Sequence, residues 1–130
     1  MPISEKHLEM IQTIVARLAS NSYAYKGWSV TIAAGLVAFL ASSHQTLLIA
    51  SIYPILAFWF LDGHSLALER AFRKLYDEAR LGNVADYSLN LTGIRRPVFD
   101  QIDAMLSLSL ALFYGSAVVF VVIMAKALAK

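Results

Sequence analysis

Histidine, aspartate and hydroxyl side chains are the residues of this sequence whose types could support chemistry. The three histidines, His7, His44 and His64, lie far apart, and none belongs to a zinc-binding helix motif such as HExxH. Asp62 and His64 could together touch a metal ion, but two ligand types at one loop do not specify a metal site. The favoured interpretation is a helix entrance with ordinary polar side chains.

The hydroxyl groups of the apolar segments lack the surroundings that a nucleophile needs. Ser29, Thr31 and Ser51 accompany no recognisable nucleophile elbow or general base, so helix packing and backbone hydrogen bonding are favoured. The glycines form no phosphate-binding loop, and the chain contains no cysteine. That composition excludes disulfides, thiolate metal sites and cysteine nucleophiles. We therefore expect neither an enzyme nor a cofactor.

The segment that must position any site is 27–61, which contains no Asp, Glu, Lys or Arg. As one helix it would run about 52 Å, well beyond a hydrocarbon core of about 30 Å. The polar run 42–45 therefore predicts a turn, and the segment predicts a transmembrane hairpin with arms at about 25–42 and 46–61. A buried helical hairpin in a soluble domain is the less favoured alternative. The apolar share of 58% and a mean hydropathy of +0.60 favour lipid as the solvent.

Two further segments flank this hairpin. Residues 104–125 again contain no charged residue, enough for one complete span, and Pro97 suits the first turn of the helix that leads into it. Residues 5–20 show an amphipathic pattern that could lie in the membrane interface or pack against the protein, and packing is slightly favoured. Asn21 and Ser22 predict a weak break after this helix.

The connection between the second and third spans should be polar. A mixed-charge helix is expected over 65–81 with a stop at Gly82, followed by a short extended segment over 84–91. Within the second span, Pro54 favours a bend, and the Ser51 hydroxyl could help to satisfy the freed backbone. The sequence thus predicts one all-α integral membrane domain over residues 1–130.

Basic residues orient these spans. The turn of the hairpin has no Lys or Arg, whereas residues 62–103 contain six, so this segment and the N-terminus should be cytoplasmic. Lys126 and Lys130 then fall outside. This mild contradiction leaves the orientation of the C-terminus open.

Small residues at every fourth position predict close helix approach on the first and third spans, within the chain or between chains. They are Ala34, Ala38, Ser42, Ser107, Ala111 and Gly115.

Aromatic and basic residues mark the expected membrane boundary. They are Lys26, Trp28, Trp59, Arg95 and Arg96. The two adjacent arginines could also bind anionic lipid headgroups, although positive-inside orientation explains them better. A possible partner surface comprises Phe72, Leu75 and Tyr76, for which covering the cytoplasmic face of the same protein is the favoured alternative.

Four stretches of the chain carry a family resemblance: NSYAYKGWSV, FWFLDGHSLALERAFRKLY, DYSLN and LFYG. Together they resemble a family of small bacterial multi-span membrane proteins whose function is largely uncharacterised, and the likeness covers most of the chain. The resemblance implies a location in the bacterial inner membrane. It supplies no activity or catalytic residues to transfer.

Two functions of different classes fit these features. The first is an oligomeric membrane effector that forms a pore or perturbs bilayer permeability in bacterial antiviral defence, where small multi-span proteins commonly serve as effectors. Three helices cannot enclose an aqueous pore alone, so this function requires a homo-oligomer. The alternative is a non-enzymatic membrane adaptor or scaffold that recruits a cytoplasmic protein through residues 64–99, favoured by the absence of charges in the spans. The small, scattered net charge of +2 predicts no nucleic-acid partner.

Overall fold

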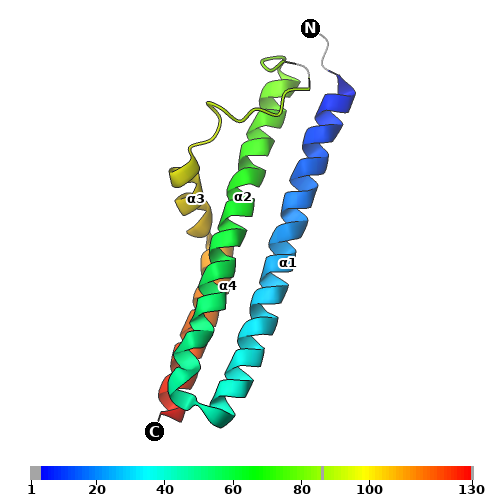
Figure 1. The fold of residues 1–130 in the computed structure, drawn as a ribbon. Coiled ribbons are helices and arrows are strands. Elements are labelled where there is room, and N and C mark those ends of the chain that lie inside the picture. The colour runs from blue at the N-terminus through cyan, green and yellow to red at the C-terminus, as the bar shows by residue number, and fades with distance from the viewer. Residues whose placement is uncertain (1–3, 86, 130) are drawn as a thin grey trace.

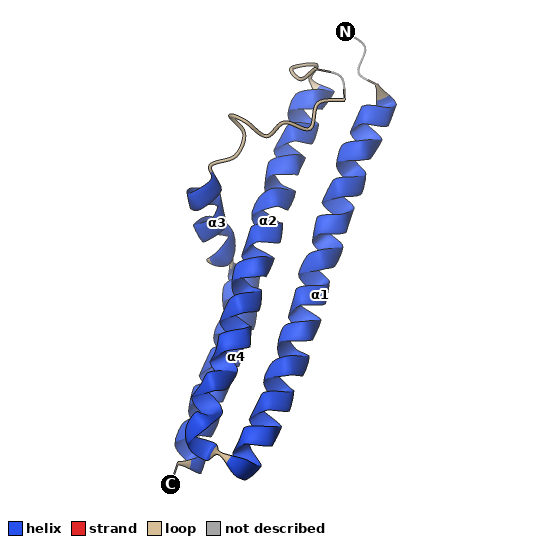
Figure 2. Ribbon diagram, in the orientation of Figure 1, coloured by secondary structure: helices blue, strands red, loops and turns tan. Residues whose placement is uncertain are grey.

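The computed structural model describes residues 4–85 and 87–129, and all its regular structure is helical (Figures 1 and 2). The elements are α1 (Glu5–Ser43), the 3-10 helix η1 (Gln45–Ser51), α2 (Ile52–Arg80), α3 (Pro97–Met105) and α4 (Leu108–Leu128). No strand occurs in the described ranges, and the all-α prediction is confirmed. Three helical segments are long and apolar enough to cross a membrane: Glu5–Ser43, Gln45–Arg80 and Leu108–Leu128.

The helices form an elongated bundle with two distinct halves. α1 and α2 are a long antiparallel pair, α4 packs on α2 and η1 near the turn, and α3 lies beside α2 farther along (Figure 1). We refer to residues 27–61 and 108–128 as the apolar half, and to residues 5–25 and 63–105 as the polar half. The start of α1 and the end of α4 lie at opposite ends of the bundle (Figure 1).

The predicted break at Asn21 and Ser22 is absent, because α1 continues without interruption from Glu5 to Ser43. Asn and Ser lower helix propensity by only a few tenths of a kcal/mol, which tertiary contacts readily override. Ser22 makes such a contact, since its hydroxyl donates a hydrogen bond to Asp62 of α2. One rigid helix therefore joins the amphipathic segment to the first apolar arm.

The hairpin turn occurs where the polar run predicts it. α1 ends at Ser43, His44 leaves helical geometry with φ −146° and ψ 69°, and η1 begins at Gln45. Pro54 is the third residue of α2 and lies in its first turn, directly after the 3-10 helix η1 ends at Ser51. The Ser51 hydroxyl is buried without a hydrogen-bond partner in the described part of the chain, so the expected backbone contact is not formed.

The second arm begins as η1, and from Ile52 it continues with the predicted polar helix as one helix, α2, without a break at Asp62 and Gly63. A glycine suits this point because a side chain here would collide with Met105 of α3. The predicted stop at Gly82 is confirmed. α2 ends at Arg80, Gly82 has φ +79°, and the amide of Asn83 donates to the Glu78 carbonyl at 3.0 Å, as in a Schellman cap.

The predicted extended segment 84–91 forms an irregular loop instead; Asp86 lies outside the described residues. The loop is fixed to α1 through His7, which is 2% exposed and whose Nε2 donates to the Ser88 carbonyl at 2.8 Å. The His7 ring also contacts the Tyr87 ring, with centroids 6.0 Å apart. Side-chain contacts with α1 replace the sheet partner that so short a segment lacks.

The last helical run begins at Pro97, as predicted, but it is divided into α3 and α4 at Leu106 and Ser107. Ser107 has an extended ψ of 145° at the N-cap position of α4, a place that serine prefers to a helix interior. The break frees the carbonyl of Met105, which accepts a hydrogen bond of 2.9 Å from the Trp59 indole. Trp59 thus satisfies a group that a continuous helix would have paired.

Each half has its own apolar cluster. In the apolar half, buried Ala33, Ile55, Leu110, Tyr114 and Val121 join α1, α2 and α4. In the polar half, buried Ile11, Leu75 and Ala79 join α1 to α2. The amphipathic N-terminal segment therefore packs against the protein.

Candidate functional site

A buried charged cluster lies between the two apolar clusters. Asp62 is 0% exposed, and its Oδ2 lies 2.7 Å from Nζ of Lys26 and 2.9 Å from the hydroxyl of Tyr114. Its other oxygen accepts a hydrogen bond from Ser22. Since Lys26 belongs to α1, Asp62 to α2 and Tyr114 to α4, one carboxylate ties the three long helices together.

Local helix geometry brings the α1 partners to the carboxylate. Ser22 and Lys26 are four residues apart, so they share one face of α1, and Nζ of Lys26 also donates to the Ser22 hydroxyl at 2.9 Å. The Lys26 side chain is 23% exposed. Its ammonium group therefore points into the molecule, while part of its hydrocarbon chain is exposed.

Aromatic rings fix the α4 partner. Tyr114 stacks on Trp59 with centroids 6.0 Å apart and planes at 11°, and it meets Phe113 edge-on at 5.0 Å. Nζ of Lys26 lies 5.9 Å from the centroid of the Phe113 ring, within cation–π range. The phenol is held rigidly enough to keep its hydrogen bond to Asp62.

The cluster is internally satisfied. Both oxygens of Asp62 accept hydrogen bonds, and the carboxylate and ammonium charges neutralise each other at contact distance. A buried ion pair of this kind contributes little against an apolar replacement of both partners, but removing one partner costs about 3–5 kcal/mol. The arrangement therefore links the three helices at one level, and each carboxylate oxygen already has a partner in the protein.

The metal interpretation of Asp62 and His64 finds no geometric support. Asp62 faces Lys26, whereas His64 is exposed, with Nδ1 3.3 Å from Gln101 Oε1 and 3.5 Å from Arg95 Nη2. Across residues 4–85 and 87–129, no three His, Cys, Asp or Glu side chains gather as a metal site would require. His44 is exposed at the hairpin turn.

The small-residue positions do not pack on one another within the chain. Ala34, Ala38 and Ser42 are exposed on α1, and no atom lies within 4 Å of the place where a Cβ on Gly115 would stand. Ser107 and Ala111 are half-buried. Packing of these positions between two chains stays a prediction.

The boundary residues divide into two groups. Lys26 and Trp59 point into the molecule, where Lys26 bonds to Asp62 and Trp59 to the Met105 carbonyl; their position at a membrane boundary stays a prediction. Trp28 is 60% exposed. Arg95 is half-buried beside His64, and Arg96 is exposed with Nε 3.8 Å from Asp100.

The partner-surface interpretation of Phe72, Leu75 and Tyr76 is corrected by their burial. Leu75 is fully buried against α1, and the other two are half-buried around the same cluster. Because this stripe is the core of the polar half, it is not free to receive another protein. These three residues lie where the alternative interpretation expects them, covering a face of the same protein.

Sequence reasoning did not assemble Asp62, Lys26, Ser22 and Tyr114 into one site, although a signal was present. His44, at the turn, lies 18 positions from both Lys26 and Asp62. Positions equally far from the turn of an antiparallel helical hairpin lie at the same level, so this lysine and this aspartate were predictable neighbours. The position of Tyr114 could not be predicted in this way, because the break between α3 and α4 determines how far along the bundle Tyr114 lies.

Comparison with known proteins gives no match: no family model, no curated protein and no solved structure resembles the chain closely enough to count.

Proposed function

We propose that the protein is an integral membrane protein whose three long helical segments cross the bilayer. From Lys26 to Ser43, α1 has 18 residues, which span about 27 Å, and the 21 residues of α4 span about 32 Å. Both lengths approach the roughly 30 Å of a hydrocarbon core. The boundary on one side would pass through the Lys26–Asp62 pair, and on the other side near the hairpin turn.

The outer surface of the apolar half supports this proposal. Large apolar side chains such as Phe39, Leu112 and Ile123 are each about 60% exposed. The exposed hydroxyls of Thr31 and Ser116 donate to carbonyls of their own helices, at 2.9 Å in both cases. Self-satisfied hydroxyls and exposed hydrocarbon are what a lipid surrounding favours.

The proposed orientation places the polar half in the cytoplasm of a bacterial cell and the turn outside, following the distribution of Lys and Arg. A short tag inserted at His44 should report the outside, and a tag at Gly82 the cytoplasm. Tags that report the same compartment from both sites would contradict the topology.

Within this topology we propose a non-enzymatic membrane adaptor, in which the spans anchor a rigid cytoplasmic stalk formed by α1, α2 and α3. The carrying observation is the distribution of charge. No charged residue lies within 27–61 or 104–125, and both carboxylate oxygens of Asp62, at the edge of the apolar half, accept hydrogen bonds from residues of the same chain. Permeation pathways often carry ionisable groups, and these spans contain no Asp, Glu, Lys or Arg. The stalk carries the charged surface.

Photo-crosslinking from single positions tests the adaptor. A crosslinking residue at Leu81, 67% exposed on the stalk, should give a discrete adduct with another protein in cells, whereas one at Leu112, 63% exposed in the apolar half, should react with lipid alone. Expression should leave the membrane potential unchanged. Adducts only between copies of this chain, accompanied by depolarisation, would contradict the adaptor.

An oligomeric effector that perturbs the bilayer, in antiviral defence, is the second candidate. It is favoured by a mostly apolar groove of about 400 Å³ between α1 and α4, whose lining includes Ala34, Ser116 and Ala117. A helix of a second copy could approach closely there. Ala34→Leu should then lower the particle mass in mild detergent and abolish depolarisation, while Ile123→Leu, on exposed surface outside the groove, should change neither. An unchanged mass would remove this candidate's support.

A further inference from the structure

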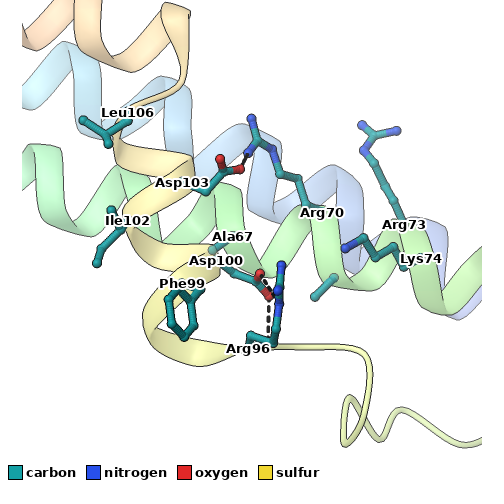
Figure 3. A pocket seen from close by; sticks show the side chains of 11 residues that line it. Ala67, Arg70, Arg73, Lys74, Arg96, Phe99, Asp100, Ile102, Asp103 and Leu106 are labelled. Carbon is teal, nitrogen blue, oxygen red and sulfur yellow. Dashed lines mark hydrogen bonds and ion pairs between the residues drawn. The ribbon is translucent and has the colours of Figure 1, made fainter.

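A cavity of about 640 Å³ opens between α2 and α3, in the polar half next to the start of α4 (Figure 3). Ala67 and Ala71 of α2 are small and buried, so they leave room between the two helices. The cavity lies apart from the Asp62 cluster and from the groove between α1 and α4. Its lining combines basic groups with exposed apolar side chains. These side chains are not buried between α2 and α3.

The basic groups come from two elements. Arg70, Arg73 and Lys74 extend from α2, and Arg96 precedes α3 on the opposite side (Figure 3). Arg70 pairs with Asp103 at 2.9 Å, and Arg96 Nε lies 3.8 Å from Asp100. Four cations and two carboxylates thus line the cavity. The lining carries a net formal charge of +2, which favours an anion.

Two of the cations are available to a ligand. Lys74 forms no ion pair with any described residue, and its side chain borders the cavity. The Arg96 side chain is 77% exposed, and its ion pair with Asp100 at 3.8 Å is long. Because exposed pairs of this kind contribute little, a phosphate group could compete for the Arg96 guanidinium.

The apolar side of the cavity belongs to α3. Phe99 and Ile102 of α3 and Leu106, which directly follows it, recur at helical spacing and line the cavity, and they are 70%, 50% and 68% exposed. Large apolar groups so exposed beyond the apolar half are poorly suited to water. They are well suited to the membrane interface, where the side chains of a short amphipathic helix reach the acyl boundary. The C-terminal end of α3 stands next to that level, since Met105 adjoins Gly63 and only Leu106 and Ser107 separate α3 from α4.

We propose that this cavity binds the phosphate headgroup of an anionic phospholipid, with Lys74 and Arg96 at the phosphate and the apolar side of α3 against the acyl chains. The proposal rests on the proposed membrane insertion. A free phosphate ion would use the cations but not Phe99, Ile102 and Leu106. An acidic protein segment would have to reach a cavity that, in this topology, faces the lipid headgroups.

The test measures lipid affinity of the full chain in detergent by native mass spectrometry, with phosphatidylglycerol and phosphatidylcholine compared at equal concentration. We expect preferential binding of phosphatidylglycerol. The double variant Lys74→Gln, Arg96→Gln should bind it about 30-fold more weakly, the factor that about 1 kcal/mol per cation gives. The matched control Lys6→Gln, Arg17→Gln removes the same charge from α1 and should retain wild-type affinity.

A second variant and a second ligand keep the outcomes separate. Phe99→Ser with Ile102→Ser preserves every charge and should also weaken lipid binding, whereas inorganic phosphate should neither compete with the lipid nor stabilise the protein. Equal binding of the two lipids, equal losses in both charge variants, or full competition by phosphate would overturn the proposal. Resistance of the wild type to alkaline extraction from membranes tests insertion separately, so that failure of the lipid site is distinguishable from failure of the proposed topology.

Discussion

In the polar half, Ile11 and Leu75 are fully buried beneath a surface of charged side chains; in the apolar half, Ile55 and Tyr114 are equally buried beneath exposed hydrocarbon such as Phe39. Both interiors are apolar, whereas the outer surface is charged in the polar half and apolar in the apolar half. α1 and α2 pass from one half to the other without a break, so secondary structure does not mark the transition. The difference supports our proposal that the solvent changes along these helices, with the Lys26–Asp62 pair at the point of change.

The largest effect should come from removing the group at this transition. Asp62→Ala would leave the Lys26 ammonium inside without its partner, and the free energy of unfolding should fall by about 3–5 kcal/mol. Unfolding in mixed micelles titrated with dodecyl sulfate measures the loss. The double variant Lys26→Met, Asp62→Leu replaces both charges with apolar groups and should recover most of the stability. An unchanged unfolding curve for Asp62→Ala would mean that the cluster does not hold the helices together.

A matched pair of leucines sharpens the comparison of the two interiors. Leu75 in the polar half is 0% exposed and Leu110 in the apolar half is 2% exposed. Leu75→Ala should cost about 3 kcal/mol, because it loses both transfer from water and packing. Leu110→Ala should cost about 2 kcal/mol less, since lipid is as apolar as the interior and only packing is lost. Equal costs in the same micelle titration would indicate that both halves meet the same solvent.

Gly63 and Gly115 compare a glycine in close contact with a neighbouring helix and a glycine next to open space. A Cβ at Gly63 would collide with the Met105 side chain, so Gly63→Ala should destabilise the protein by about 1–3 kcal/mol. At Gly115 no neighbouring atom lies within 4 Å, and Gly115→Ala should be neutral or stabilise by up to about 1 kcal/mol. The expected difference lies in the position of α3 against α2, so proteolysis in the 81–96 loop should increase only for Gly63→Ala.

The smallest effect is expected at the charged surface. Arg73 pairs with Glu69 one turn away at 2.8 Å, with the arginine 62% exposed. Arg73→Gln should lower stability by about 0.3–0.5 kcal/mol, and added salt should remove the difference. A loss above about 2 kcal/mol would show that this face is buried in an assembly.

The sequence predicted those parts of the fold that local chemistry decides. The polar run 42–45 gave the turn, Gly82 gave the end of α2, and Pro97 gave the start of α3. Each rests on a single residue type whose backbone preference or polarity acts within one turn of helix. The three long apolar segments were equally visible, because length and hydropathy suffice to define them.

The remaining features depend on contacts between helices. Asn21 and Ser22 predicted a break, but both lie inside the continuous helix α1, where Ser22 bonds to Asp62 of α2. Ser107 gave no warning of the break that separates α3 from α4, because the indole of Trp59 compensates it from another helix. The bond between Asp62 and Tyr114 also depends on how the helices pack against one another. Spacing about the turn points to Lys26, whereas Tyr114 can be placed only after α4 is placed.

Labelling of single cysteines tests the central proposal, that three helices cross a bilayer with one boundary at the Lys26–Asp62 pair. The chain has no native cysteine, so each introduced thiol reports one site. In sealed membranes, a membrane-impermeant maleimide added to the appropriate side should label Arg17→Cys and Ser43→Cys from opposite sides. It should fail to label Ala34→Cys and Leu112→Cys, which are exposed in the structure but would face lipid. Rapid labelling of Ala34→Cys and Leu112→Cys, as at Arg17→Cys, would contradict the membrane-spanning account.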